Sequence, residues 1–296
     1  MASRPALQMP PEPPEPEQPL SAVPGQGRAG RNLPAAIGVG VLLACLVTVP
    51  LFSPYRWLFI MVVAGAAVIG SREIMAALRT LGPRPAAVPV VVGSLAMVAA
   101  AYLGGSEALF LAWLATALLC LLWRLAAPPQ GFLRDVAASV FTATYVPFLI
   151  SFAALLAIPA DGPRRVTIFV ATVTASDIGG YAAGVLFGKH PMAPTVSPKK
   201  SWEGFCGSML ACSLAGAVLF VTLFHASALL GVVFGLAVVA TATLGDLGES
   251  MVKRDIGIKD MGSLLPGHGG LMDRLDSLLP TAPVALLLLS AFVPTH

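Results

Sequence analysis

Charged residues are scarce in this sequence. Only 11% of its 296 residues are Asp, Glu, Lys or Arg, whereas an average soluble domain carries roughly 25%. Apolar residues make up 56%, the mean hydropathy is +0.82, and the apolar residues fall into long runs. Because so few charges cannot cover a water-facing surface, we expect most of the chain to be solvated by lipid. The net charge of +3 is too small to indicate nucleic-acid binding.

Cysteine is also rare. None of the four cysteines forms a CxxC pair or stands near a metal-ligating partner, so the sequence supports neither a disulfide framework nor a zinc site. All of them lie in apolar runs, and we interpret them as small buried apolar residues. They are Cys45, Cys120, Cys206 and Cys212.

Nine apolar runs each approach the roughly 20 residues that a helix needs to cross a bilayer. The sequence therefore predicts an all-α, polytopic integral membrane protein with about nine transmembrane helices. Arg72 and Glu73 interrupt the second run near one end, where we expect both side chains to snorkel to the interface. The runs cover 33–52, 57–78, 86–103, 108–125, 136–158, 166–188, 204–224, 226–245 and 275–293.

The distribution of Lys and Arg predicts the orientation. With the N-terminus inside, the outside loops hold only Arg56, Arg164 and Arg165, and most other basic residues fall in inside segments. Since cytoplasmic segments are enriched in Lys and Arg, we expect a cytoplasmic N-terminus in a bacterial-type plasma (inner) membrane. The two most polar loops, 189–203 and 246–274, then share the cytoplasmic face.

Ten charged residues lie between positions 246 and 276, in a chain with 18 basic and 15 acidic residues. Asp246, Glu249 and Lys253 would lie on one face of a helix that leaves the membrane. Asp273 and Asp276 stand at the entrance to the last run. Carboxylates beside cations are typical of sites that hold Mg²⁺ and phosphate. A solvated loop whose charges pair with each other is the alternative, and spacing alone leaves both open.

A long polar pattern in this region resembles a known signature. It consists of Ser250, Lys253-Arg254, Lys259-Asp260 and the segment 265–276, which reads LPGHGGLMDRLD. The block SPKKSWEG at 197–204 agrees with it, as does Asp177, which precedes a series of glycines. Together they resemble the phosphatidate cytidylyltransferase (CDP-diglyceride synthetase) family. The diagnostic resemblance covers about 165–277, and the N-terminal half is similar only as a set of membrane spans.

The resemblance implies an enzyme that makes CDP-diacylglycerol and pyrophosphate from CTP and phosphatidic acid. It also implies that the enzyme is surrounded by membrane lipids and forms a homodimer. Asp246 and Asp273 are the leading predicted ligands of Mg²⁺, with Glu249 and Asp276 as supporting carboxylates. A second cation such as K⁺ stays open. Further catalytic candidates are Lys253, Arg254, Lys259, Asp260 and His268. The predicted substrate-binding residues are Asp177, Ser197, Lys199, Lys200, Trp202, Glu203, Ser250 and Arg274.

Several of these residues have a plainer interpretation. Asp177 interrupts an apolar run, where an unpaired carboxylate costs about 3 kcal/mol or more, and it could be a structural polar residue instead of a site residue. Gly180, Gly184 and Gly188 follow it at four-residue steps, which would let a neighbouring helix approach closely. Lys199, Lys200 and Trp202 could be interfacial anchors. For His268, flanked by glycines, backbone and side-chain roles compete evenly.

Three units follow from this interpretation: a disordered Pro/Glu-rich tail at 1–30, membrane helices over 31–160, and a catalytic membrane region over 161–296 with the signature at 250–276. Rival functions are a CTP-dependent lipid kinase, a cytidylyltransferase for another lipid, and, from a different class, a transporter with Asp177 on its path. The lack of an internal repeat and the crowding of charge at one membrane face speak against the transporter.

Overall fold

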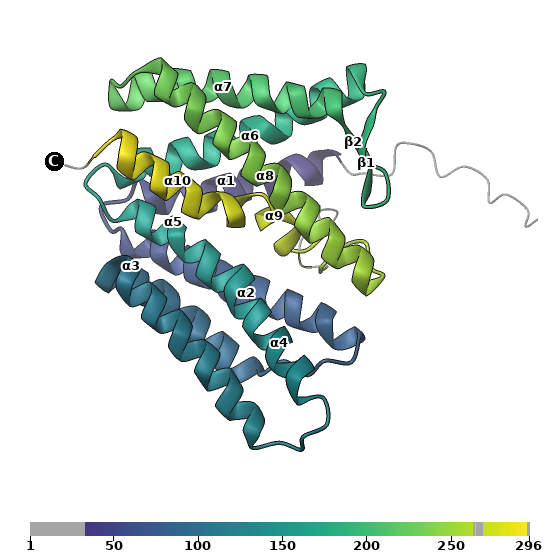
Figure 1. The fold of residues 1–296 in the computed structure, drawn as a ribbon. Coiled ribbons are helices and arrows are strands. Elements are labelled where there is room, and N and C mark those ends of the chain that lie inside the picture. The colour runs from purple at the N-terminus through teal and green to yellow at the C-terminus, as the bar shows by residue number, and fades with distance from the viewer. Residues whose placement is uncertain (1–32, 263, 265–268, 295–296) are drawn as a thin grey trace, which may run out of the picture.

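A computed structural model describes residues 33–262, 264 and 269–294, so the tail predicted for 1–30 lies outside the described residues. Helices dominate this part of the chain (Figure 1). They are α1 (Leu33–Leu51), α2 (Trp57–Thr80), α3 (Ala87–Leu125), α4 (Phe132–Ala143), the π-helix η1 (Thr144–Phe148), α5 (Leu149–Ala157), α6 (Gly162–Phe187), α7 (Trp202–Phe224), α8 (Ala228–Ile256), α9 (Met272–Leu275) and α10 (Leu278–Phe292). A short antiparallel hairpin joins α6 to α7, with strands β1 (Pro191–Ala193) and β2 (Ser197–Ser201).

Seven helical segments among the described residues are long and apolar enough to cross a membrane. In this count α4, η1 and α5 form one segment, α9 and α10 form another, and α3 counts once. The apolar part of α1 is shorter, over Gly40–Leu51. The predicted all-α, polytopic membrane architecture is therefore confirmed, with a small β-hairpin that the sequence pattern did not predict.

Helix α3 folds back on itself. Its backbone leaves the helical conformation at Gly105, where φ is +73°, a value that glycine adopts at little cost. The two arms then pack together so closely that a Cβ at Gly93 would lie 2.2 Å from Cγ2 of Thr116. The predicted runs 86–103 and 108–125 are thus the two arms of α3.

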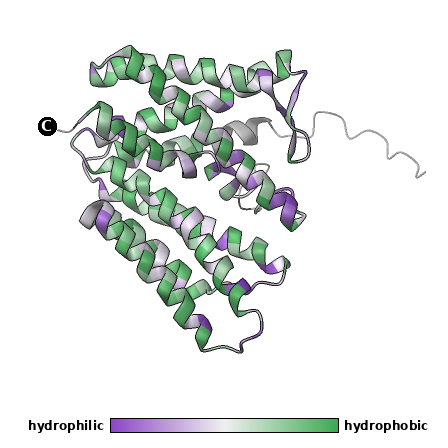
Figure 2. Cartoon of the chain, in the orientation of Figure 1, coloured by the Kyte–Doolittle hydropathy of each residue, from purple (hydrophilic) through white to green (hydrophobic). Residues whose placement is uncertain are grey.

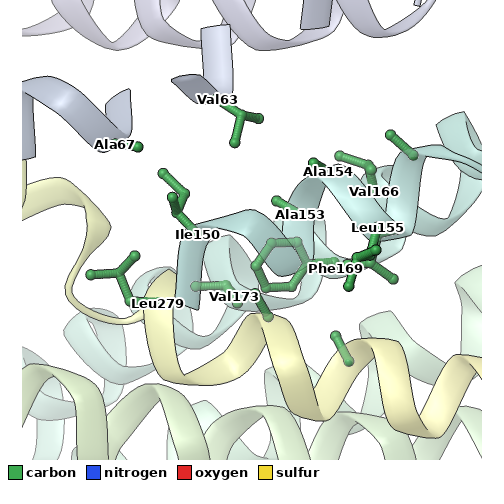
Figure 3. Packing of buried hydrophobic residues seen from close by; sticks show 14 of the residues in the cluster. Val63, Ala67, Ile150, Ala153, Ala154, Leu155, Val166, Phe169, Val173 and Leu279 are labelled. Atoms are coloured by element: carbon green, nitrogen blue, oxygen red, sulfur yellow. The ribbon is translucent and has the colours of Figure 1, made fainter. Parts of the chain in front are cut away.

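The bundle has two halves (Figure 1). In the N-terminal half α2 packs against α3, α4 and α5, and in the C-terminal half α7 packs along both α6 and α8. Helices α5 and α10 contact each other and join the halves. Apolar side chains fill the space between the halves, among them Val63, Ile150, Phe169 and Leu279 (Figure 3).

Glycine brings α6 and α7 together, as expected from the series after Asp177. A Cβ at Gly179 would lie 2.7 Å from the carbonyl oxygen of Gly207, and one at Gly180 would lie 2.5 Å from Oγ of Ser208. Any larger residue would push the helices apart, because packed interiors leave no spare volume. This approach sets the width of the polar pocket described below.

Hydrophilic residues gather at one end of the bundle, over β1, β2 and the C-terminal end of α8 (Figure 2). The four cysteines are free, but Cys45 and Cys206 are exposed, so the prediction that all four are buried was wrong for these two. The side chains of both lie on the outside of apolar helices, where lipid solvates a small thiol as well as a protein core does.

Candidate active site

A pocket of about 280 Å³ lies at the polar end of the bundle, between α6, α7, α8 and strand β2. It brings together four of the predicted site residues, Asp177, Lys199, Lys200 and Asp246. Its remaining walls include small and hydroxyl-bearing residues, which leave room for a ligand between three closely packed helices. They are Ser176, Gly180, Gly184, Ser201, Gly204, Ser208, Ala242, Thr243 and Ser277, with Tyr181, Met192 and Phe205.

An ion pair crosses this pocket. Nζ of Lys200 on β2 contacts Oδ2 of Asp246 on α8, and both side chains keep part of their surface exposed. The pair ties the hairpin to α8. Because both partners stay accessible, an incoming phosphate or cation can compete for either of them.

A second charged cluster lies further along α8. Nζ of Lys253 donates hydrogen bonds to Oε2 of Glu249 at 2.7 Å and to Oδ1 of Asp273 at 2.9 Å. Oδ2 of Asp273 accepts hydrogen bonds from the backbone N–H groups of Met261 at 3.0 Å and Gly270 at 2.8 Å. Lys253 thus bridges a carboxylate of α8, Glu249, and a carboxylate at the entrance of the last span, Asp273.

Glu73 contributes to this cluster from the N-terminal half, and the sequence analysis missed it. Its Oε1 accepts a hydrogen bond from the N–H of Leu271 at 3.0 Å, and its Oε2 accepts one from Met272 at 2.8 Å. The expectation that Glu73 snorkels to the interface was wrong, because its half-buried side chain instead turns to the protein and caps the start of α9. A carboxylate within an apolar run was the available signal, since such a group needs a partner.

Several polar atoms beneath the cluster are buried without a hydrogen-bond partner among the described residues. They include the hydroxyl of Tyr145 and Oε1 of Glu249, whose side chain is fully buried. Tyr145 lies on the π-helix η1, within range of the charges of Glu249, Asp276 and Asp246. π-Helical turns recur at functional sites. Because unpaired buried polar groups are costly, a ligand or water that formed hydrogen bonds with these two groups would be favoured here.

Residues 31–292 match a family model whose description is "Cytidylyltransferase family". The chain belongs to this family. Among its curated relatives is the "Phosphatidate cytidylyltransferase" of Mycobacterium leprae (strain TN), 46% identical over 281 residues that cover 89% of each chain. The protein of the same name from Mycobacterium tuberculosis (strain ATCC 25618 / H37Rv) is 43% identical over 278 residues, 89% of this chain and 84% of the relative.

A plant relative extends the similarity. "Phosphatidate cytidylyltransferase 4, chloroplastic" of Arabidopsis thaliana is 31% identical over 280 residues, which cover 84% of this chain and 70% of the relative. The resemblance inferred from residues 165–277 is thus confirmed and extends into the N-terminal half. Glu73 and Tyr145 both lie within the residues that the family model matches.

In this cytidylyltransferase, some predicted site residues hold the hairpin in place. Oε1 of Glu203 pairs with Nδ1 of His190 at 2.6 Å, and Oε2 accepts hydrogen bonds from the N–H groups of Lys189 and His190. Nε of Arg254 donates to the carbonyl oxygen of Val196 at 3.2 Å. Glu203 and Arg254 therefore fix the hairpin against α7 and α8, a role that spacing did not reveal.

The other predicted residues do not line the pocket. Ser197 begins β2, Trp202 is exposed and packs edge-on against Phe205, and Ser250 is half-buried on α8. Lys259 and Arg274 are exposed. Asp260 is exposed in the loop after α8, where its carboxylate lies near Gly269. His268 lies outside the described residues. The structure thus assembles a pocket and a charged cluster, and the individual catalytic roles remain predictions.

Proposed function

We propose that this chain transfers the cytidylyl group of CTP to phosphatidic acid, giving CDP-diacylglycerol and pyrophosphate. The observation that carries the proposal is the polar pocket with its Lys200–Asp246 pair, set at the end of a lipid-solvated bundle beside the Glu249–Lys253–Asp273 cluster. The printed names of the relatives agree with this activity. No observation favours the lipid kinase or the transporter.

The pocket suits two phosphate-bearing substrates of different character. Asp177 lies within the membrane-spanning helix α6, whereas Lys199 and Lys200 lie on the hairpin outside it. A site that extends from a membrane helix to a polar hairpin can admit a lipid phosphate from one side and a nucleotide from the other. The lysines would lower the repulsion between the two anions, and positioning with charge stabilisation is the main source of catalysis in such transfers.

In the proposed reaction a phosphate oxygen of phosphatidic acid attacks the α-phosphorus of CTP. The new P–O bond forms as the bond between the α-phosphorus and the bridging oxygen to the β-phosphorus breaks, and pyrophosphate leaves with that electron pair. Lys200 and Lys253 are the cations best placed to stabilise the charge on the phosphates, because each already holds a carboxylate at the site. No proton transfer is needed if the lipid phosphate arrives ionised.

Asp246 and Asp273 remain the proposed leading Mg²⁺ ligands, with Glu249 and Asp276 in support. The residues fit such an ion, because Oε1 of Glu249 is buried without a hydrogen-bond partner in the described segments and Asp276 lies within range of the charges of Asp246 and Glu249. Within those segments no three His, Cys, Asp or Glu side chains could hold a metal ion by themselves. Mg²⁺ is commonly held by one or two carboxylates together with substrate phosphates and water, and when bound it would neutralise charge on the leaving pyrophosphate.

The proposed topology has nine crossings and a cytoplasmic N-terminus. The seven long segments become nine crossings when the two arms of α3 are counted separately and α1 is added. The excess of Lys and Arg at the polar end supports the orientation. With the N-terminus inside, the pocket faces the cytoplasm, which supplies CTP. The bacterial relatives support a plasma-membrane location. A homodimer rests on the family resemblance alone.

One assay tests the reaction. The purified protein is incubated with phosphatidic acid, Mg²⁺ and CTP that carries separate labels in the cytosine and in the γ-phosphate. Cytosine label in the lipid fraction, together with γ-label in pyrophosphate, is the expected result. Transfer of γ-label to the lipid would indicate a kinase, and the absence of any transfer would indicate the transporter; either result contradicts the proposal.

A further inference from the structure

A second groove lies on the N-terminal half, away from the pocket. It has a volume of about 430 Å³ and runs between α2 and the first arm of α3. Two arginines of α2, Arg72 and Arg79, border it. Its other walls are apolar and consist of Met75, Ala76, Ala87, Val88, Val91 and Val92.

Arg72 and Arg79 lie seven residues apart, so they share one face of α2. Arg72 stands eight residues before the end of the helix at Thr80, which places it about 12 Å along the axis from that end. Both residues are exposed on a membrane-spanning helix. The adjacent Glu73 points elsewhere, because its carboxylate caps Leu271 and Met272.

Neither guanidinium has a hydrogen-bond or ion-pair partner among the residues that the structure describes. An Arg within the hydrocarbon region costs about 2.5 kcal/mol or more unless it is paired or reaches polar headgroups. The guanidinium also matches the geometry of a phosphate, which it can bind through two parallel hydrogen bonds. An anion from the surrounding lipid would therefore satisfy both arginines at once.

We propose that this groove binds an anionic phospholipid, with its phosphate between Arg72 and Arg79. One acyl chain then follows the apolar wall formed by Val88, Val91 and Val92 on α3. The groove suits such a ligand because its charge is concentrated on α2 and its apolar surface on α3. A second copy of this chain would instead have to bury two unpaired cations, which is costly.

Native mass spectrometry of the purified full-length protein in detergent tests this site. Equal amounts of phosphatidylglycerol and phosphatidylcholine are added, and the retained lipids are counted. The wild-type protein should retain phosphatidylglycerol preferentially, and Arg72→Gln or Arg79→Gln should lower this retention about tenfold, the effect of losing one charge-assisted hydrogen bond. Arg164→Gln, which removes an exposed arginine far from the groove in sequence, is the matched control and should retain the lipid as the wild-type protein does.

A further variant keeps both charges. Val92→Trp places a bulky ring on an exposed groove residue and should also lower phosphatidylglycerol retention. Wild-type retention in both arginine variants would overturn the proposal, as would retention that does not distinguish the two lipids. A dimer that Val92→Trp dissociates, without preference for the anionic lipid, would assign the groove to a second copy. None of these measurements uses CTP, so their outcome is independent of the proposed reaction.

Discussion

Glu73 should hold the start of α9 and the signature segment in the position that the site requires. Its two oxygens accept hydrogen bonds from Leu271 and Met272 at 3.0 and 2.8 Å. Glu73→Gln retains one acceptor oxygen and turns an amide N–H₂ group toward the other backbone N–H. The lost charge-assisted hydrogen bond is worth roughly 1.5–3 kcal/mol. A loss of about 2 kcal/mol corresponds to an approximately 30-fold change in the local opening equilibrium.

Hydrogen exchange of the purified protein measures this opening directly. The amides of Leu271 and Met272 should exchange about 30-fold faster in Glu73→Gln, while amides in the core of α10 keep their rates, because local opening is independent of global unfolding. Glu107→Gln replaces an exposed carboxylate in the same half of the chain and serves as the control. Unchanged exchange at Leu271 and Met272 in Glu73→Gln would refute the capping role.

Three further predictions concern the Lys200–Asp246 pair, the buried hydroxyl of Tyr145 and the close contact between α6 and α7. Lys200→Met removes the partner of Asp246 and should lower CDP-lipid formation more than tenfold, whereas Lys189→Met should not; equal rates in the two variants would contradict the role of the pair. Tyr145→Phe removes a buried hydroxyl that has no hydrogen-bond partner in the described part of the chain, and it should slow turnover while leaving the melting temperature unchanged. A wild-type rate would contradict a role of this hydroxyl in the reaction. Gly207→Ala brings a Cβ within 2.6 Å of the carbonyl oxygen of Gly179 and should destabilise the protein by about 1–3 kcal/mol. Its melting temperature should be lower than that of the control Gly65→Ala, where a Cβ meets nothing within 4 Å.

The helices and the charged cluster could be predicted because they follow from local rules. Apolar runs of bilayer length predict spans, and the spacing of Asp246, Glu249 and Lys253 places them on one helix face. The contact between Lys253 and Asp273 follows once the chain returns to the same membrane end. Each of these features depends on a short stretch of sequence, so the pattern of residues is sufficient to predict it.

The contributions of the N-terminal half could not be predicted in this way. Glu73 and Leu271 lie 198 positions apart, and no local pattern indicates that α2 packs near α9. The hydroxyl of Tyr145 points into the bundle from a π-helical turn that contains Pro147, and such turns have no simple periodic signal. Pairings of this kind depend on how the two halves of the bundle pack.

The carboxylates of α8 and α9 provide the most direct test of the proposed active site. Asp246→Asn and Asp273→Asn keep the size of each side chain and remove its charge, so the variants should insert and purify normally. With labelled CTP, phosphatidic acid and Mg²⁺, the wild-type protein should form CDP-diacylglycerol and both variants should form none. Turnover like that of the wild-type protein in either variant, at ordinary Mg²⁺ concentration, would contradict the assignment of that carboxylate to the reaction.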